Sequence, residues 1–96
     1  MTRNVNYKKN KDVLKAHKAS FENEYLVKRA SKCGCFCCGE IFNPSEIVEW
    51  VPDRGGETAI CPYCLVDSVL PDSAGYPVTK AFLEKMNKKW FDGCLM

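Results

Sequence analysis

Two Cys-x-x-Cys pairs are the residues of this chain best suited to chemistry. The first pair is Cys35 and Cys38, the second is Cys61 and Cys64, and residues 39–60 separate them. Two intervening residues let both thiolates of a pair converge from one turn. Four thiolates suit the tetrahedral geometry of Zn²⁺, with Zn–S distances of about 2.3 Å. The spacing therefore predicts one structural zinc site.

A site of this kind closes the coordination sphere of the metal. Four protein ligands leave no open position for water or substrate, so the predicted zinc fixes a fold without supplying an activity. Cys33 and Cys37 lie two residues from Cys35, a spacing that does not allow the same convergence, and we expect both to stay outside the ligand set. Cys94, near the end of the sequence, is expected to be a free thiol.

Length and composition predict one small domain, residues 1–96, whose hydrophobic core alone would be marginal. The apolar content is 46%, which argues against general disorder. No apolar run reaches the ~18 residues that cross a bilayer, and residues 1–9 lack the apolar segment of a secretory signal. We therefore expect a cytoplasmic protein with reduced thiols. There, metal binding explains paired cysteines better than disulfides do, and the odd count of seven cysteines agrees.

The N-terminal third carries most of the positive charge. Residues 1–32 hold nine Lys or Arg and three acids, whereas residues 33–96 hold five bases and nine acids. Residues 1–9 are expected to form a flexible tail, and residues 10–31 a helical arm, because this segment lacks Pro and Gly. Either one helix begins after an N-cap at Asn10, or Ser20 caps a second, shorter helix. The sequence leaves both open.

Four residues of the arm recur at helical spacing and predict one inward-facing stripe: Leu14, His17, Phe21 and Tyr25. His17 is the only histidine of the sequence. We expect it to be a packed or hydrogen-bonded residue rather than a metal ligand, because four better ligands exist.

The zinc module is predicted to span residues 32–70. Each Cys-x-x-Cys pair is expected to lie in a zinc knuckle, a tight turn of the main chain around the metal. The residue after the second cysteine of a knuckle requires a positive φ, and Gly39 stands at this position in the first pair. A short strand over 40–42 and a β-hairpin with strands at 47–51 and 58–61 are predicted to connect the two pairs. Pro62 favours a short helix over 64–70, which Pro71 would end.

This order of elements is typical of a treble-clef finger, whereas a zinc ribbon would have strands in place of the short helix. Residues 78–92 are predicted to form a C-terminal helix with Thr79 as its N-cap. We expect Val78 to contact Leu83 of this helix. The apolar face of the helix is expected to pack on the zinc module and consists of Phe82, Leu83, Met86 and Trp90. The fold class is therefore small α+β, a treble-clef or zinc-ribbon-like β-hairpin module flanked by two helical segments.

Two catalytic interpretations fit single motifs but not the whole chain. Cys61-Pro62-Tyr63-Cys64 spells the active-site tetrad of glutaredoxins, yet only 32 residues follow it and the first cysteine pair would have no role. His-Asn-His nucleases use a treble clef, but no histidine follows Cys38. The carboxylates of Glu49, Asp53 and Asp67 have no predicted nucleophile or base beside them. We expect no catalytic residues and no enzyme.

Many positions besides the cysteines also form a pattern. The chain contains Cys-Gly-Cys-Phe-x-Cys-Gly-Glu-Ile-Phe at its first pair, Thr-Ala-Ile-Cys-Pro-Tyr-Cys at its second, and Gly-Tyr-Pro-Val-Thr before its last helix. From Ser31 to Phe91 it resembles a family of small bacterial cytoplasmic proteins that have a four-cysteine zinc finger and no assigned activity. The resemblance implies Cys35, Cys38, Cys61 and Cys64 as ligands and supplies no catalytic residue. Cys37 stands where an aromatic residue is expected in such relatives.

These features favour a non-enzymatic, zinc-binding module that interacts with a protein partner. An immunity or antitoxin-like protein that occludes a toxin is one class of such module. The alternative is a nucleic-acid-binding zinc finger that sets the basic N-terminal helix against phosphates, with Trp50, Tyr63 or Tyr76 available for stacking. Against this alternative, the acidic module and the net charge of −2 on a zinc tetrathiolate would repel a polyanion. No membrane partner is expected.

Overall fold

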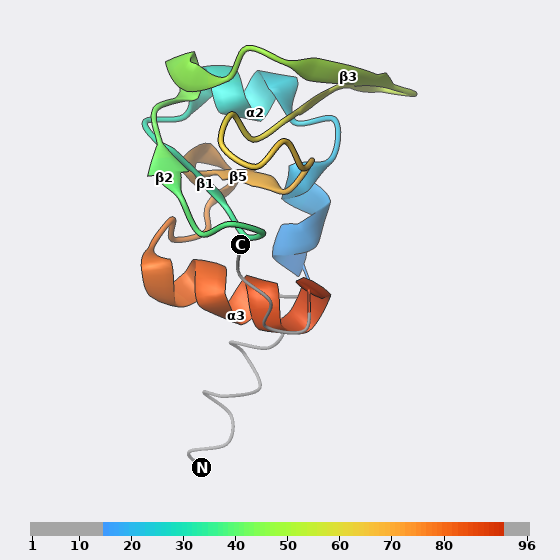
Figure 1. The fold of residues 1–96 in the computed structure, drawn as a ribbon. Coiled ribbons are helices and arrows are strands. Elements are labelled where there is room, and N and C mark those ends of the chain that lie inside the picture. The colour runs from blue at the N-terminus through green and yellow to red at the C-terminus, as the bar shows by residue number, and fades with distance from the viewer. Residues whose placement is uncertain (1–14, 92–96) are drawn as a thin grey trace.

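A three-stranded antiparallel sheet lies at the centre of residues 15–91, the part of the chain that the computed structural model describes (Figure 1). Strand β1 (Cys33–Cys35) is central, between β2 (Ile41–Phe42) and β5 (Val69–Pro71). Cys33 is paired with Phe42 on one side and Pro71 on the other, and Cys35 is paired with Val69. The first metal-binding candidate, Cys35, is therefore fixed by the central strand of the sheet.

The second sheet is a β-hairpin that extends to one side of the molecule (Figure 1). Strands β3 (Trp50–Asp53) and β4 (Gly56–Ala59) pair from Trp50 with Ala59 to Asp53 with Gly56. The predicted hairpin is confirmed, but both boundaries differ. A short 3₁₀ helix, η2 (Pro44–Glu46), precedes the hairpin, and β3 begins at Trp50, three residues later than expected. The turn is also shorter than expected, because the strands pair as far as Asp53 and Gly56.

A single continuous helix over residues 10–31 is wrong for the described residues. A 3₁₀ helix, η1 (His17–Ser20), is followed by a break and then by α2 (Glu24–Arg29). Glu22, in the break, has a φ of +47°. Its N–H donates to Thr58 Oγ1 at 2.9 Å, and its carboxylate accepts from the Gly55 N–H at 3.1 Å. Contacts with the hairpin therefore outweigh the local helical preference.

The alternative of two segments with a bend agrees with this arrangement, but the N-cap position of α2 is occupied by Asn23 rather than Ser20. The proposed N-cap at Asn10, and the tail over residues 1–9, lie outside the described residues.

The predicted inward stripe of the arm is wrong at Phe21 and Tyr25. Phe21 is 46% exposed and Tyr25 is 62% exposed, while Leu14 lies outside the described residues. The buried residues of the arm are others, and they lie on both sides of the break: Ala16, Ser20, Asn23 and Val27. Mostly small or polar side chains face inward because the arm contacts the strands directly. Asn23 Nδ2 donates to the carbonyls of Ala19 and Val69, and Asn23 Oδ1 accepts from the Ala59 N–H.

The predicted short helix over residues 64–70 is wrong as well. The chain turns after Cys64 and then forms β5, in which Val69 and Leu70 are buried and paired with β1. Because Val69 and Leu70 point to opposite faces of the sheet, they contribute to two different apolar clusters. Pairing with β1 thus decides the conformation of this segment.

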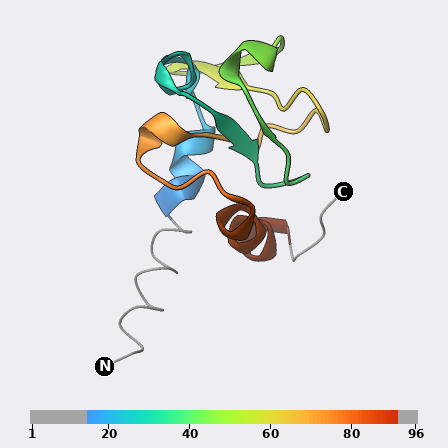
Figure 2. The ribbon, with the colours of Figure 1, turned by 90° about the vertical axis from the view of Figure 1, so that its left-hand side faces the viewer.

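The C-terminal helix α3 (Lys80–Phe91) forms a layer of its own beneath the central sheet, seen end-on in Figure 2. Thr79 Oγ1 accepts from the Phe82 N–H at 3.2 Å, so the predicted N-cap is confirmed. The helix and the segment before it approach β1 closely at Gly34, where an added Cβ would lie 2.8 Å from Val78 Cγ1 and 2.9 Å from Leu83 Cδ1 of α3. Phe82, Leu83 and Met86 are buried as expected, and Trp90 is half-buried.

A small α+β architecture is therefore confirmed, with two antiparallel sheets and two α-helices among the described residues. Within the same residues, no helix combines the length and apolar character that crossing a membrane requires.

Candidate metal centre

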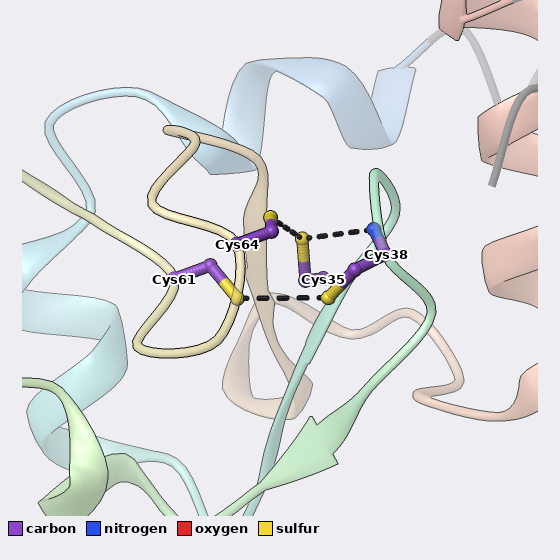
Figure 3. A group of neighbouring side chains, drawn as sticks. All are labelled: Cys35, Cys38, Cys61 and Cys64. Atoms are coloured by element: carbon purple, nitrogen blue, oxygen red, sulfur yellow. Dashed lines mark hydrogen bonds between the residues drawn. The ribbon is translucent and has the colours of Figure 1, made fainter. Parts of the chain in front are cut away.

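The structure brings the four predicted cysteines together. Their Sγ atoms all lie within 4.8 Å of one another, and the sulfurs of the two pairs point toward each other (Figure 3). Cys35 Sγ lies 3.5 Å from Cys64 Sγ, and Cys38 Sγ lies 3.8 Å from Cys61 Sγ. A tetrahedron with Zn–S bonds of about 2.3 Å has S···S edges of about 3.8 Å. These sulfurs therefore fit around one metal ion, and the cysteines are free rather than disulfide-bonded.

The first knuckle is closed by two main-chain hydrogen bonds. The Gly39 N–H donates to the Cys35 carbonyl at 2.8 Å, and the Cys35 N–H donates to the Glu40 carbonyl at 2.9 Å. Gly39 has a φ of +82°, the left-handed conformation expected at this position. These bonds turn the chain so that Cys35 and Cys38 face the same point.

The second knuckle repeats this backbone pattern. The Leu65 N–H donates to the Cys61 carbonyl at 3.0 Å, and the Cys61 N–H donates to the Val66 carbonyl at 3.0 Å. Leu65 has a φ of +65°, although it is not a glycine. The two knuckles are thus equivalent in backbone geometry, and Leu65 occupies the position that Gly39 occupies in the first.

Main-chain amides point at the sulfurs in both knuckles. Cys35 Sγ accepts from the N–H groups of Cys37 at 3.3 Å and Cys38 at 3.5 Å. Cys61 Sγ accepts from the Tyr63 N–H at 3.4 Å. These donors stabilise negative charge on sulfur, which is the form of cysteine that binds a metal.

The electrostatics of the four thiols are uneven. Burial opposes ionisation of Cys35, but hydrogen bonds from the Ser68 hydroxyl and from the Cys38 and Cys37 amides outweigh it and lower the pKa of this thiol. Burial raises the pKa of Cys38 to about 12. Burial, followed by the negative charge of Cys35, raises the pKa of Cys64. A metal ion must therefore displace protons from the cluster, so metal affinity falls as the pH falls.

The cysteines left outside the predicted ligand set have other surroundings. Cys33 is buried in the apolar cluster beside β2 and β5, and burial, with a smaller effect from Asp72, raises the pKa of its thiol to about 12. Cys37 is also buried, and its N–H donates to Cys35 Sγ, but Cys37 is not part of the group of four cysteines close enough to hold a metal. Cys94 lies outside the described residues.

The other candidate residues do not join the cluster. Among residues 15–91, the four cysteines form the one group of His, Cys, Asp or Glu side chains close enough to hold a metal. The His17 ring packs 4.0 Å from the Trp90 ring and 5.2 Å from the Phe21 ring, measured between centroids, as expected for a packed residue. Glu49 and Asp67 are exposed.

Sequence reasoning missed Ser68. Its Oγ lies 3.0 Å from Cys35 Sγ, although it is 33 residues away in sequence. No motif marks this serine, because its position depends on the pairing of β5 with β1. Only the tertiary structure reveals the contact.

Comparison with known proteins yields no match: no protein-family model fits the chain, and no curated protein or solved structure is significantly similar to it. The resemblance to small bacterial cytoplasmic proteins therefore stays a prediction. The case for the metal centre rests on the geometry of this chain alone.

Proposed function

We propose that the chain is a zinc-stabilised, non-enzymatic module that acts by binding a protein partner. The observation that carries the metal assignment is the convergence of four sulfurs, all within 4.8 Å of one another, from two equivalent knuckles. Tetrahedral sulfur sites hold zinc or iron, and zinc is the metal that stabilises small folds through such sites without redox chemistry. The strand β5 after the second knuckle favours a zinc-ribbon type over a treble clef.

The position of the cluster supports a structural role for the metal. Cys35 and Cys61 are fully buried and belong to the same apolar cluster as Val27, Phe42 and Val69. Without a metal, the sulfurs and the main-chain N–H groups directed at them would be buried in this apolar cluster with no cation to balance the charge of the thiolates. Metal binding is therefore expected to be coupled to folding.

A chelator experiment tests this structural role. The protein is incubated with a strong zinc chelator under reducing conditions and followed by circular dichroism and thermal unfolding. We expect loss of the folded spectrum and its return when zinc is added back. An unchanged spectrum and melting temperature after complete metal removal would contradict the structural role.

The proposal of a binding module rather than an enzyme follows from the coordination chemistry. Four protein ligands leave the metal no open position, so it cannot activate a water molecule or polarise a substrate. The described residues add no second metal-binding group that would offer one.

Exposed apolar side chains support a protein partner. Four large residues are more than half exposed: Tyr25, Val48, Tyr63 and Leu65. Tyr63 and Leu65 both belong to the second knuckle, and the Tyr63 hydroxyl donates to the Glu46 carboxylate, which orients its ring. A rigid aromatic residue with a polar tip is common at protein interfaces. A toxin occluded by an immunity or antitoxin-like protein would be one such partner.

The partner is tested by purifying the tagged chain from its native cells together with matched variants. Leu65→Lys removes an exposed apolar side chain from the second knuckle, and Lys18→Glu changes an exposed residue of the arm. We expect one stoichiometric protein to co-purify with the native chain and with Lys18→Glu but not with Leu65→Lys. The proposed binding surface around Leu65 would be contradicted if no stoichiometric protein co-purified with the native chain. It would also be contradicted if the same protein co-purified with all three chains.

Nucleic-acid binding remains the second candidate because the bases of the described part of the arm face solvent: Lys15, Lys18, Lys28, Arg29 and Lys32. One of them, Lys28, is paired with Glu24 at 3.0 Å. A salt titration separates the candidates, because phosphate binding weakens steeply with salt. Affinity for arbitrary DNA or RNA that falls in this way, and that Lys18→Glu reduces, would favour this candidate.

A further inference from the structure

The two knuckles differ at one buried hydroxyl group. A sulfur in each knuckle accepts from the main-chain N–H two residues further along, which is Cys37 for Cys35 and Tyr63 for Cys61. Cys35 receives an additional donor from outside its knuckle, because Ser68 Oγ lies 3.0 Å from its sulfur. This contact breaks the equivalence of the two halves of the cluster.

Ser68 is held rigidly in this position. It is 1% exposed, and its carbonyl accepts the N–H of Phe36 at 3.1 Å. The next residue, Val69, is paired with Cys35 itself in the β1–β5 ladder. Ser68 directly precedes β5, so the pairing of β5 with β1 fixes its hydroxyl beside the Cys35 sulfur.

The direction of this hydrogen bond follows from the chemistry of the bound state. A metal-bound thiolate carries no proton and can only accept, so the hydroxyl must donate. A donor to a charged sulfur is stronger than a neutral hydrogen bond, and in a buried site it offsets part of the charge that four thiolates bring. Residues that orient ligands in this way affect metal affinity by about 10–100-fold.

We propose that Ser68 is a positioning residue of the metal centre, whose hydroxyl donates to the Cys35 thiolate and thereby orients it and raises the affinity of the site for its metal. This inference rests on the proposed zinc site and extends it to a residue outside both cysteine pairs. It makes one ligand, Cys35, the most strongly hydrogen-bonded of the cluster.

A merely structural serine provides the matched control. Ser20 is also 1% exposed, and its hydroxyl donates to the His17 carbonyl at 2.7 Å, with no contact to a sulfur. Ser20→Ala and Ser68→Ala each remove one buried hydroxyl group. Only the second removes a donor to a thiolate, so a difference between them in metal affinity isolates the contact with Cys35.

The test measures zinc affinity by competition with a chromogenic chelator, and the absorption spectrum of the Co²⁺-substituted protein. Ser68→Ala is expected to lower metal affinity by about 10–100-fold. It is also expected to move the thiolate-to-cobalt charge-transfer band to longer wavelength, because a sulfur without the donor holds its electrons less tightly. Ser20→Ala is expected to change neither quantity, and Ser68→Thr, which keeps the hydroxyl, is expected to stay close to the native protein.

Native affinity and an unmoved cobalt band in Ser68→Ala would overturn the proposal while leaving the zinc site intact. Failure of the native chain to bind zinc or cobalt would instead refute the site itself. If Ser68→Ala does not fold, the native protein loaded with an NMR-active cadmium isotope gives the answer. Scalar coupling between cadmium and the Ser68 hydroxyl proton would support the hydrogen bond, and its absence would overturn it.

Discussion

Leu65 occupies a backbone position that the first knuckle gives to glycine. Its φ is +65°, against +82° at Gly39, and the same two main-chain hydrogen bonds close both knuckles. Leu65 is 68% exposed, so its side chain contributes little burial to set against this conformation. We therefore predict that glycine is preferred to alanine at residue 65, the reverse of the order found in regular secondary structure.

The expected difference in stability between Leu65→Gly and Leu65→Ala follows from two opposing free-energy contributions. A left-handed backbone costs an L-residue about 1–2 kcal/mol, and glycine avoids this cost. Glycine loses about 0.5–1 kcal/mol more than alanine in backbone entropy on folding. The difference leaves Leu65→Gly more stable than Leu65→Ala by about 0.5–1 kcal/mol. Because both variants lack the leucine side chain, the contacts of that side chain do not contribute to the difference between them.

The assay is thermal unfolding of the metal-loaded variants at equal protein and metal concentrations. For a domain of this size, 1 kcal/mol corresponds to about 4–8 °C in Tm. Ala81, an exposed residue of α3, provides the control, because Ala81→Gly in a helix is expected to lose about 1 kcal/mol. A Leu65→Ala protein more stable than Leu65→Gly would refute the proposed equivalence of the knuckles.

Four further substitutions test the packing and the ligand set. Gly34→Ala should lower the free energy of unfolding by about 1–3 kcal/mol, measured in denaturant, because its methyl group would overlap the side chains that α3 packs on β1; native stability would contradict this packing. Asn23→Ala should lower the free energy of unfolding by about 3 kcal/mol in the same assay, because the buried main-chain groups that the Asn23 amide joins would lose their hydrogen-bond partners. A loss below about 1 kcal/mol would show that water or rearrangement replaces these hydrogen bonds. In metal analysis, Cys33→Ala should keep one equivalent of metal, whereas Cys64→Ala should lose tight metal binding. Loss of metal in Cys33→Ala and its retention in Cys64→Ala would show that the ligand set is wrong.

Some elements could be predicted from the sequence because local chemistry decides them. The Cys-x-x-Cys spacing and Gly39 specify a knuckle within a few residues, so the gathering of four sulfurs follows once the two pairs meet. The apolar repeat of α3 and its N-cap at Thr79 are equally local. In these cases the residues that determine the structure are neighbours in the chain.

Elements that depend on distant partners could not be predicted. The arm breaks at Glu22 because its main chain and carboxylate bind the hairpin more than 30 residues away. Residues 69–71 form a strand because β1 pairs with them, although Pro62 favoured a short helix over residues 64–70. The contact of Ser68 with Cys35 has the same origin, since it follows from strand pairing that no local pattern reveals.

The stoichiometry of the bound metal tests the central claim most directly. The chain is purified under reducing conditions without added metal, and its zinc, iron and sulfur contents are measured by elemental analysis. One tightly held zinc ion per chain is the result that four converging thiolates predict. Substantially less than one equivalent of metal, or one equivalent of iron in place of zinc, would contradict it.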